Sequence, residues 1–314
     1  MNIFLSDEFP QWQKRIKMLL ETAWIDSDAN EIKIDRWLAN FRGDKRQIDE
    51  ERRIACHLLQ QFIYFGKSEV EESMRVLFRD HFIYPAVQEL RTHQPDIPQL
   101  MAALKSRIVN ETRFIGMGLP AESGTGMLYR FRIANDLPLA IFPELNSILK
   151  GHNGNITTNP SSLKRIIIMD DLCATGEQVE VRMGSTVNRI RTSCPHLKVD
   201  YFLLFATARG VKNCRQSGLF NEVAAAIIFD DDYQVFSPSS LFYKEPIQGV
   251  SAAVGEEVCG HYGGKLKPLL PLGFRNSQLL IGFEHNTPDN TLPVFWKDDD
   301  QMPWHAVFPR VEKH

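Results

Sequence analysis

Apolar residues recur at helical spacing through the first third of the chain. They fall three or four positions apart in two runs, one from Ile54 to Phe65 and one from Val70 to Phe82. That spacing places the apolar side chains on one face of a helix. We therefore predict that residues 7–108 are almost entirely helical and that residues 1–110 form an N-terminal helical region.

Near residue 110 the pattern changes to short apolar runs separated by loops and helical segments. Strands are expected at residues 114–117, 139–142, 166–169, 199–206 and 223–229, and helices at residues 127–134 and 179–191. This alternation is typical of an α/β fold, in which helices flank a parallel sheet. We expect such a domain over residues 111–296, followed by a tail over residues 297–314.

Composition and charge narrow the class of protein. The chain is 43% hydrophobic and 24% charged, as in soluble globular proteins, and its net charge of −3 argues against bulk nucleic-acid binding. Its five cysteines are scattered and odd in number, which favours free thiols over disulfides or a zinc site. Without a signal-like or membrane-length apolar segment, the expected location is the cytoplasm, with no membrane partner.

Residues 166–178 carry the clearest candidate chemistry. Four apolar residues predict a strand buried on both faces, and ligands of open α/β sheets bind outside the carboxyl ends of such strands. A polar turn that opens a helix there offers backbone N–H groups to a phosphate. The candidate residues that follow the apolar run are two acids and a turn of small and polar residues: Asp170, Asp171, Ala174, Thr175, Gly176, Glu177 and Gln178.

This segment resembles the phosphoribosyl-diphosphate (PRPP) motif of the type I phosphoribosyltransferases, which has four apolar residues, two acids and a Thr-Gly loop. The resemblance implies that Asp170 and Asp171 bind the ribose 2- and 3-hydroxyls and act in catalysis. It implies that residues 174–178 bind the 5-phosphate and that Mg²⁺ is the cofactor. The family usually ends the loop with Ser or Thr, so Gln178 departs from the pattern. The alternative interpretation is an ordinary buried strand with an acidic turn.

Two further segments lie in the order expected of that family. A small-residue loop at residues 116–126 precedes the acidic strand, where the family binds pyrophosphate. The residues implied are Glu122, Ser123, Gly124, Thr125 and Gly126. A Gly-, Asn- and Thr-rich stretch at residues 150–160 lies where the family carries a flexible hood over PRPP. A tight turn and a plain surface loop are the respective alternatives.

A polar segment near the end of the chain extends the resemblance. Residues 282–296, the region of residues 36–38 and the Thr-Gly-x-Gln loop resemble the PRTase-CE family of bacterial conflict systems, which includes retron-associated anti-phage proteins. The resemblance implies an effector or accessory enzyme in phage defence, with a partner protein or a nucleic-acid-containing defence complex. The polarity of the segment suggests that the acceptor approaches His285, Asn286, Asp289 and Asn290.

Three functions stay open at this stage. The first is phosphoribosyl transfer from PRPP with Mg²⁺. The second is non-catalytic sensing of PRPP or a nucleotide, which the departure at Gln178 permits. The third is hydrolysis of a nucleotide on the same fold.

Overall fold

The chain is described by a computed structural model over residues 10–93, 96–117, 123–150, 157–244, 250–299 and 302–311. Its contacts divide it into two compact units. The first unit combines Met1–Val70 with Asp230–His314, and the second is Glu71–Phe229. The division falls within helix α4 (Lys67–Phe78).

The first unit packs helices from both ends of the chain around an aromatic core. Its elements are α1 (Pro10–Thr22), α2 (Glu31–Leu38), α3 (Ile48–Leu59), β1 (Ile63–Phe65), η3 (Asp231–Tyr233), η4 (Leu241–Tyr243), α11 (Ala252–Leu266), η5 (Phe274–Asn276), β8 (Ile281–Phe283) and α12 (Pro293–Trp296). The buried Trp37 indole donates a hydrogen bond of 2.7 Å to the Val294 carbonyl, and the Phe62 ring stacks on Phe308 at 4.0 Å.

These contacts group the chain differently from the expected boundaries at residues 110 and 296. Strand β1 lies within the segment expected to be helical, and it pairs in parallel with β8. Trp304 and Phe308, in the expected tail, are buried in the same core as the N-terminal helices. The physical reason is that the amphipathic N-terminal helices bury their apolar faces against residues 235–308.

The second unit is built on a four-stranded parallel sheet of order β2-β5-β6-β7. The strands are β2 (Thr112–Gly116), β5 (Arg165–Cys173), β6 (Lys198–Thr207) and β7 (Val223–Phe229), and β3 (Leu149–Lys150) and β4 (Thr157–Thr158) form a separate antiparallel pair. The helical segments are the second part of α4, the π-helical η1 (Arg79–Ile83), α5 (Tyr84–Arg91), α6 (Ile97–Val109), α7 (Ser123–Ala134), η2 (Leu139–Ile141), α8 (Leu145–Ile148), α9 (Glu177–Ser193) and α10 (Ala208–Gln216). The predicted α/β class with a parallel sheet is confirmed.

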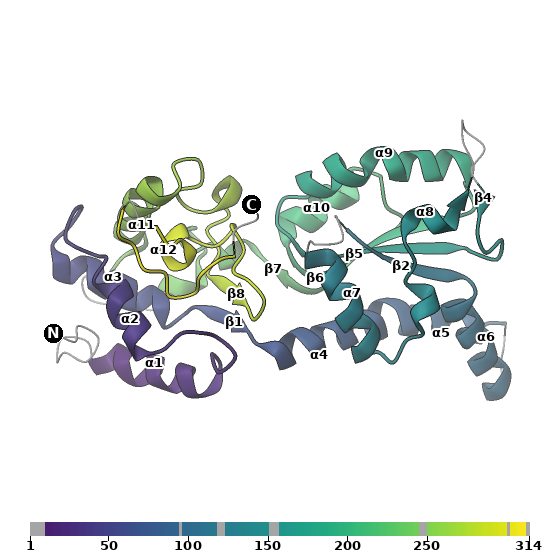
Figure 1. Ribbon diagram of the computed structural model, residues 1–314, viewed down its shortest axis with the longest axis horizontal. Helices are drawn as coiled ribbons and strands as arrows, with labels where there is room; N and C mark the ends of the chain where they lie inside the picture. Colours follow the sequence, from purple (N-terminus) through teal and green to yellow (C-terminus); the bar gives the residue numbers. More distant parts are fainter. Residues whose placement is uncertain are drawn as a thin grey trace. The chain divides into compact units, whose positions relative to one another are not determined.

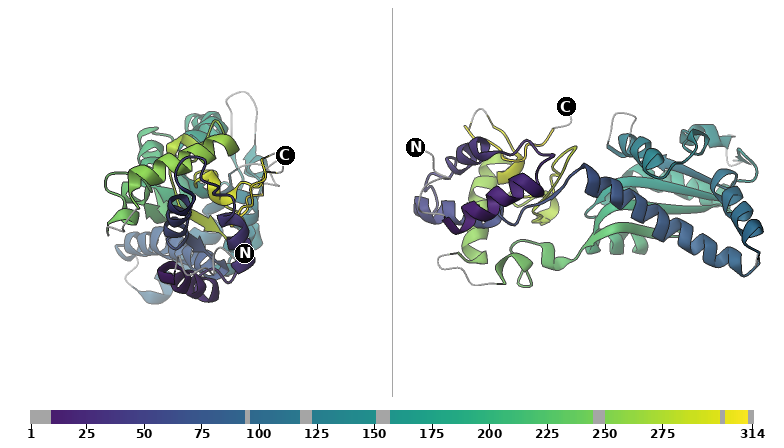
Figure 2. Two further views of the ribbon diagram at one scale, coloured as in Figure 1. Left: turned by 90° about the vertical axis from the view of Figure 1, so that its left-hand side faces the viewer. Right: turned by 90° about the horizontal axis from the view of Figure 1, so that it is seen from below.

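Helices cover both faces of this sheet (Figure 1). On one face, Val187 of α9 and Val211 of α10 pack with Ile168 and Tyr201 of the sheet. On the other, Phe78 and Phe131 contact Phe114 of β2. Figure 2 shows the run from α4 to α5 lying across that second face. Burial on both faces explains the near-continuous apolar runs of the strands.

One expected strand is wrong. Within residues 139–142, Leu139–Ile141 form the 3₁₀ turn η2 and do not join the sheet, although Ile141 is buried. An apolar run this short does not distinguish a strand from a buried turn. Across the described ranges, every helix is too short or too polar to span a bilayer.

Candidate functional site

The two adjacent acids end the buried strand β5 and differ in exposure. Successive strand residues point to opposite faces of a sheet. Asp170 is only 5% exposed and lies on the α9 and α10 side with Tyr201, while Asp171 is half-buried. Alternation along the strand therefore gives the two carboxyls different surroundings.

Asp170 is held by groups within the unit. Its Oδ2 accepts a hydrogen bond of 3.0 Å from the Tyr201 hydroxyl, and its Oδ1 accepts one of 3.0 Å from the Asp171 amide. Burial raises the pKa of Asp170 well above its ordinary value, and the neighbouring Asp171 charge adds to the rise. The Tyr201 hydrogen bond opposes that rise. Asp171 is thus the acid of the pair that a ligand reaches more readily.

In the turn after β5, residues 174–178, most side chains are buried or half-buried, so the turn offers a ligand mainly its backbone. Ala174 and Thr175 are buried, Gly176 and Glu177 are half-buried, and Gln178 is exposed. Gly176 has φ +80° and caps α9, and a Cβ there would lie 3.0 Å from the Cys214 sulfur. The positive φ favours glycine at this position, and a side chain would also press on Cys214.

The amino end of α9 has features that attract an anion and features that repel one. A 17-residue helix presents the positive end of its dipole and several N–H groups without intrahelical partners. However, Glu177 and Glu180 lie in its first turn. These carboxylates suit the helix dipole but repel a phosphate, so any phosphate here depends on well-placed backbone N–H groups.

Side chains at the start of α10 and within it support the turn, and they were not among the predicted site residues. The Thr207 hydroxyl donates to the Ala174 carbonyl at 2.6 Å, and the Asn213 side-chain amide donates to the Thr175 carbonyl at 2.8 Å. Gly210 packs so closely that a Cβ there would lie 2.4 Å from the Cys173 carbonyl oxygen. A threonine after a strand is a helix-cap signal, but no local pattern pairs it with a turn so far back in the chain.

The predicted pyrophosphate loop is only partly described. Glu122 and residues 151–156 of the predicted hood lie outside the described residues. Ser123, Gly124, Thr125 and Gly126 form the first turn of α7, and Gly126 is exposed with open space around its Cα. Strands β3 and β4 pair on either side of the undescribed hood residues. The last four residues of the predicted loop thus belong to a helix.

The predicted acceptor residues belong to the first unit. Asn286 accepts from the Val311 amide at 2.9 Å, Asn290 donates to the Ser277 hydroxyl at 3.0 Å, and Asp289 pairs with Arg310 at 3.6 Å. His285 is exposed and stacks on Phe283. Much of the polarity of this segment therefore serves to hold the segment itself.

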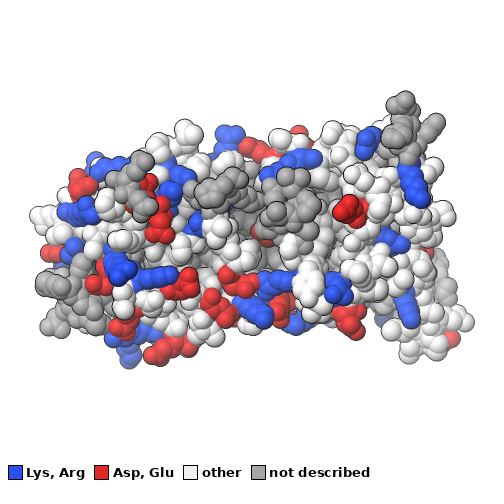
Figure 3. All heavy atoms as spheres, viewed as in Figure 1, with Lys and Arg blue, Asp and Glu red and all other residues white. Residues whose placement is uncertain are grey.

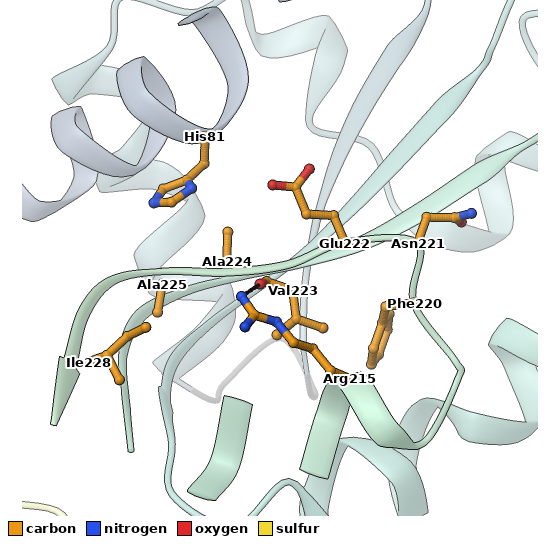
Figure 4. Close-up of a pocket in the computed structure, with 9 residues that line it drawn as sticks. All are labelled: His81, Arg215, Phe220, Asn221, Glu222, Val223, Ala224, Ala225 and Ile228. Carbon is orange, nitrogen blue, oxygen red and sulfur yellow. Dashed lines mark hydrogen bonds between the residues drawn. The ribbon is translucent and has the colours of Figure 1, made fainter. Parts of the chain in front are cut away.

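A hollow of about 330 Å³ lies elsewhere in the second unit, beside strand β7 (Figure 4). Its lining includes His81, Arg215 and Glu222, together with apolar residues of β7. The Arg215 guanidinium donates to the Val223 carbonyl at 3.0 Å. The hollow contains none of the predicted site residues, so it is distinct from the turn after β5.

Charge is mixed on the visible surface. Basic and acidic side chains are interspersed over the face shown in Figure 3. Within the described ranges, no group of three or more His, Cys, Asp or Glu side chains is placed to hold a metal ion. Any metal at the acidic strand would therefore need further oxygen ligands from water or a substrate.

The match to a family model agrees with the sequence resemblance. A sequence model of the PRTase-CE family matches residues 34–310. A solved structure of Helicobacter pylori xanthine-guanine-hypoxanthine phosphoribosyltransferase matches 53% of this chain and 90% of its own, at 10% identity and a TM-score of 0.25. No curated protein matches the chain. Because the family match spans most of the sequence, the chain belongs to the PRTase-CE family.

Proposed function

We propose that the second unit binds PRPP or a related phosphoribosyl nucleotide at the carboxyl end of β5 and transfers its phosphoribosyl group. The observation that carries the proposal is one strand–turn–helix segment. In it, the half-buried Asp171 precedes a turn that opens α9 and is held by hydrogen bonds from Thr207 and Asn213. Membership of a phosphoribosyltransferase-like family supports it. Ligands of parallel α/β sheets bind at this end of the strands.

Asp171 and the turn would recognise different parts of the ligand. Asp171 accepts hydrogen bonds from the ribose hydroxyls, while the backbone of residues 174–178 binds the 5-phosphate. Asp170 is buried against Tyr201, so we assign it the support of Asp171, whose amide it binds. The exposed Gln178 contributes its backbone N–H and has no hydroxyl to offer. Residues 122–126 are the proposed contact for the pyrophosphate.

Magnesium fits this arrangement as a partner of the ligand. Mg²⁺ prefers oxygen ligands, keeps several waters, and is commonly held by one or two carboxylates together with substrate phosphates. Asp171 is one half-exposed carboxylate of that kind. When bound, Mg²⁺ would neutralise charge on the pyrophosphate.

In the proposed transfer, the bond between the anomeric carbon and the pyrophosphate oxygen breaks, and the electron pair leaves with pyrophosphate. The carbon then carries positive charge, which the Asp171 carboxylate stabilises electrostatically. The acceptor supplies the lone pair for the new bond and releases its proton to solvent.

The ligand is tested by thermal and urea unfolding with PRPP and Mg²⁺. At about a hundred times the dissociation constant, the ligand should add about 2.7 kcal/mol to the free energy of unfolding. Asp171→Asn should lose most of this gain. Asp96→Asn, which changes an exposed carboxyl at the start of α6, should keep it. A folded wild-type protein that gains no stability would contradict the proposal.

Turnover separates the three candidate functions. A transferase consumes PRPP only when an acceptor such as a nucleobase or an amine is present. A hydrolase consumes a nucleotide alone, and a sensor binds PRPP without consuming it. Mass spectrometry of PRPP, pyrophosphate and ribosylated product, with Asp171→Asn as the inactive control, distinguishes these outcomes.

The proposed cellular setting is anti-phage defence in a complex with a partner protein or nucleic acid, as the family resemblance implies. Phage plaque counts on bacteria that carry the native gene neighbourhood provide the test. The wild-type chain should lower the counts, Asp171→Asn should restore them, and Asp96→Asn should behave as wild type. Equal counts for all three would exclude a defensive role for this site.

A further inference from the structure

Helix α10 fixes two successive peptide groups of the turn after β5. Thr207 binds the Ala174 carbonyl at 2.6 Å and Asn213 binds the Thr175 carbonyl at 2.8 Å. Thr207 also accepts a hydrogen bond of 2.9 Å from the Gly210 amide, which caps α10. One hydroxyl therefore couples the start of α10 to the turn.

Fixing a carbonyl also fixes the amide on the other side of the same peptide bond. In a planar trans peptide, the C=O and the following N–H point in opposite directions. When Thr207 draws the Ala174 carbonyl toward α10, the Thr175 N–H must point away from α10. Asn213 binds the next carbonyl, that of Thr175, and so fixes the plane of the peptide between Thr175 and Gly176.

Because the turn is buried, these two hydrogen bonds limit how its peptide groups can rotate. Ala174 and Thr175 have little exposed surface, and the Gly210 backbone packs directly against the Cys173 carbonyl. The Cys173 and Cys214 sulfurs meet at 3.6 Å on the same side. Because α10 occupies this side of the turn, the Thr175 N–H faces away from α10.

We propose that Thr207 and Asn213 are positioning residues, which set the backbone of residues 174–176 to receive the 5-phosphate of a phosphoribosyl ligand. This inference rests on the function proposed above. Thr207 orients the Thr175 N–H as a phosphate donor. Asn213 holds Gly176 at the left-handed geometry from which α9 begins. Neither side chain needs to touch the ligand.

The test compares Thr207→Val, which keeps shape but loses the hydroxyl, with Thr207→Ser, which keeps the hydroxyl. Thr207→Val and Asn213→Ala should weaken PRPP binding by about tenfold, the value of one charge-assisted hydrogen bond. Thr207→Ser should bind as wild type. The control Thr192→Val removes an exposed hydroxyl that bonds within α9, and its affinity should not change.

Two further measurements separate positioning from general loss of structure. Affinity for inorganic pyrophosphate alone should be unchanged in Thr207→Val, because the 5-phosphate turn is not used. In the free protein, amide NMR spectra and residual dipolar couplings should show a reoriented Thr175 N–H in Thr207→Val and the native orientation in Thr207→Ser.

The outcomes distinguish this inference from the proposed function. Wild-type protein that binds no PRPP would overturn the proposed function, and the spectra of the free protein would still decide whether Thr207 orients the Thr175 amide. Wild-type binding with unchanged PRPP affinity in both Thr207→Val and Asn213→Ala would overturn the inference and leave the proposed function standing. An unchanged Thr175 N–H orientation in Thr207→Val would also overturn it.

Discussion

The Tyr201 hydroxyl donates a hydrogen bond of 3.0 Å to Oδ2 of Asp170, and both side chains are buried. Tyr201 lies on β6 and also stacks on Phe220 at 5.0 Å, so its position is set by packing. The bond joins the acidic end of β5 to the core beneath α9 and α10. One member of the Asp-Asp pair is therefore part of the scaffold, which leaves Asp171 as the proposed ligand contact.

Tyr201→Phe should destabilise the protein while keeping its fold. The change leaves a buried carboxyl oxygen without its donor, which typically costs about 1–3 kcal/mol. Urea unfolding at neutral pH measures the free energy of unfolding. Tyr84→Phe, at a position that is 53% exposed, should change it by less than about 0.5 kcal/mol. Similar effects of the two substitutions would show that the Tyr201 hydroxyl contributes no more to the free energy of unfolding than an exposed hydroxyl does.

Asp170→Asn should gain stability relative to wild type as pH rises. The folded pKa of Asp170 is raised above its ordinary value of 3.8, chiefly by burial. The wild-type carboxyl therefore contributes stability that is full below the unfolded pKa and is lost as pH rises through the folded pKa. Asparagine does not titrate. The free-energy difference should move in favour of Asp170→Asn by up to about 1.4 kcal/mol per pH unit above about pH 4.

Urea unfolding of wild type and Asp170→Asn from pH 4 to pH 8 measures this trend. The difference should level off above the folded pKa. A difference that is constant across the range would contradict a raised pKa for Asp170. A difference that moves in favour of wild type as pH rises would show that folding lowers the pKa of Asp170.

Gly210→Ala should disturb the turn after β5. A Cβ at this position would lie 2.4 Å from the Cys173 carbonyl oxygen, so the backbone must shift. We expect a loss of about 1–3 kcal/mol of stability from overpacking, together with weaker PRPP binding. Gly184→Ala in α9 meets neighbours only at 3.8 Å and beyond, so it should stabilise by up to about 1 kcal/mol. Equal stability of the two variants would show that α10 does not pack tightly on the turn.

Glu180→Gln should tighten PRPP binding. Glu180 is an exposed carboxylate in the first turn of α9, where the phosphate is proposed to bind. Removing one surface charge near a helix end is worth about 0.3–1 kcal/mol, which is about a two- to fivefold gain in affinity. The gain should shrink in high salt because exposed charges are screened. Calorimetry with Glu144→Gln as an exposed control measures it, and weaker binding by Glu180→Gln would place the phosphate elsewhere.

The sequence by itself determined the elements whose signals are local. The apolar run before Asp170, the glycine at position 176 and the helix after it are encoded in consecutive residues, so the strand–turn–helix segment was predictable. The parallel sheet followed from the alternation of such segments. Short runs were less secure, as residues 139–142 show, because a few apolar residues fit either a strand or a buried turn.

Only the tertiary structure decided which groups meet across long stretches of chain. It brought Trp37 to Val294, so that the two ends of the chain share one core. It turned Asp170 toward Tyr201, and it placed Thr207 and Asn213 behind the turn. These contacts depend on strand register and helix packing, which no local pattern of residues encodes. The sequence thus located the acidic turn, and the packing around it gave its two carboxyls different surroundings.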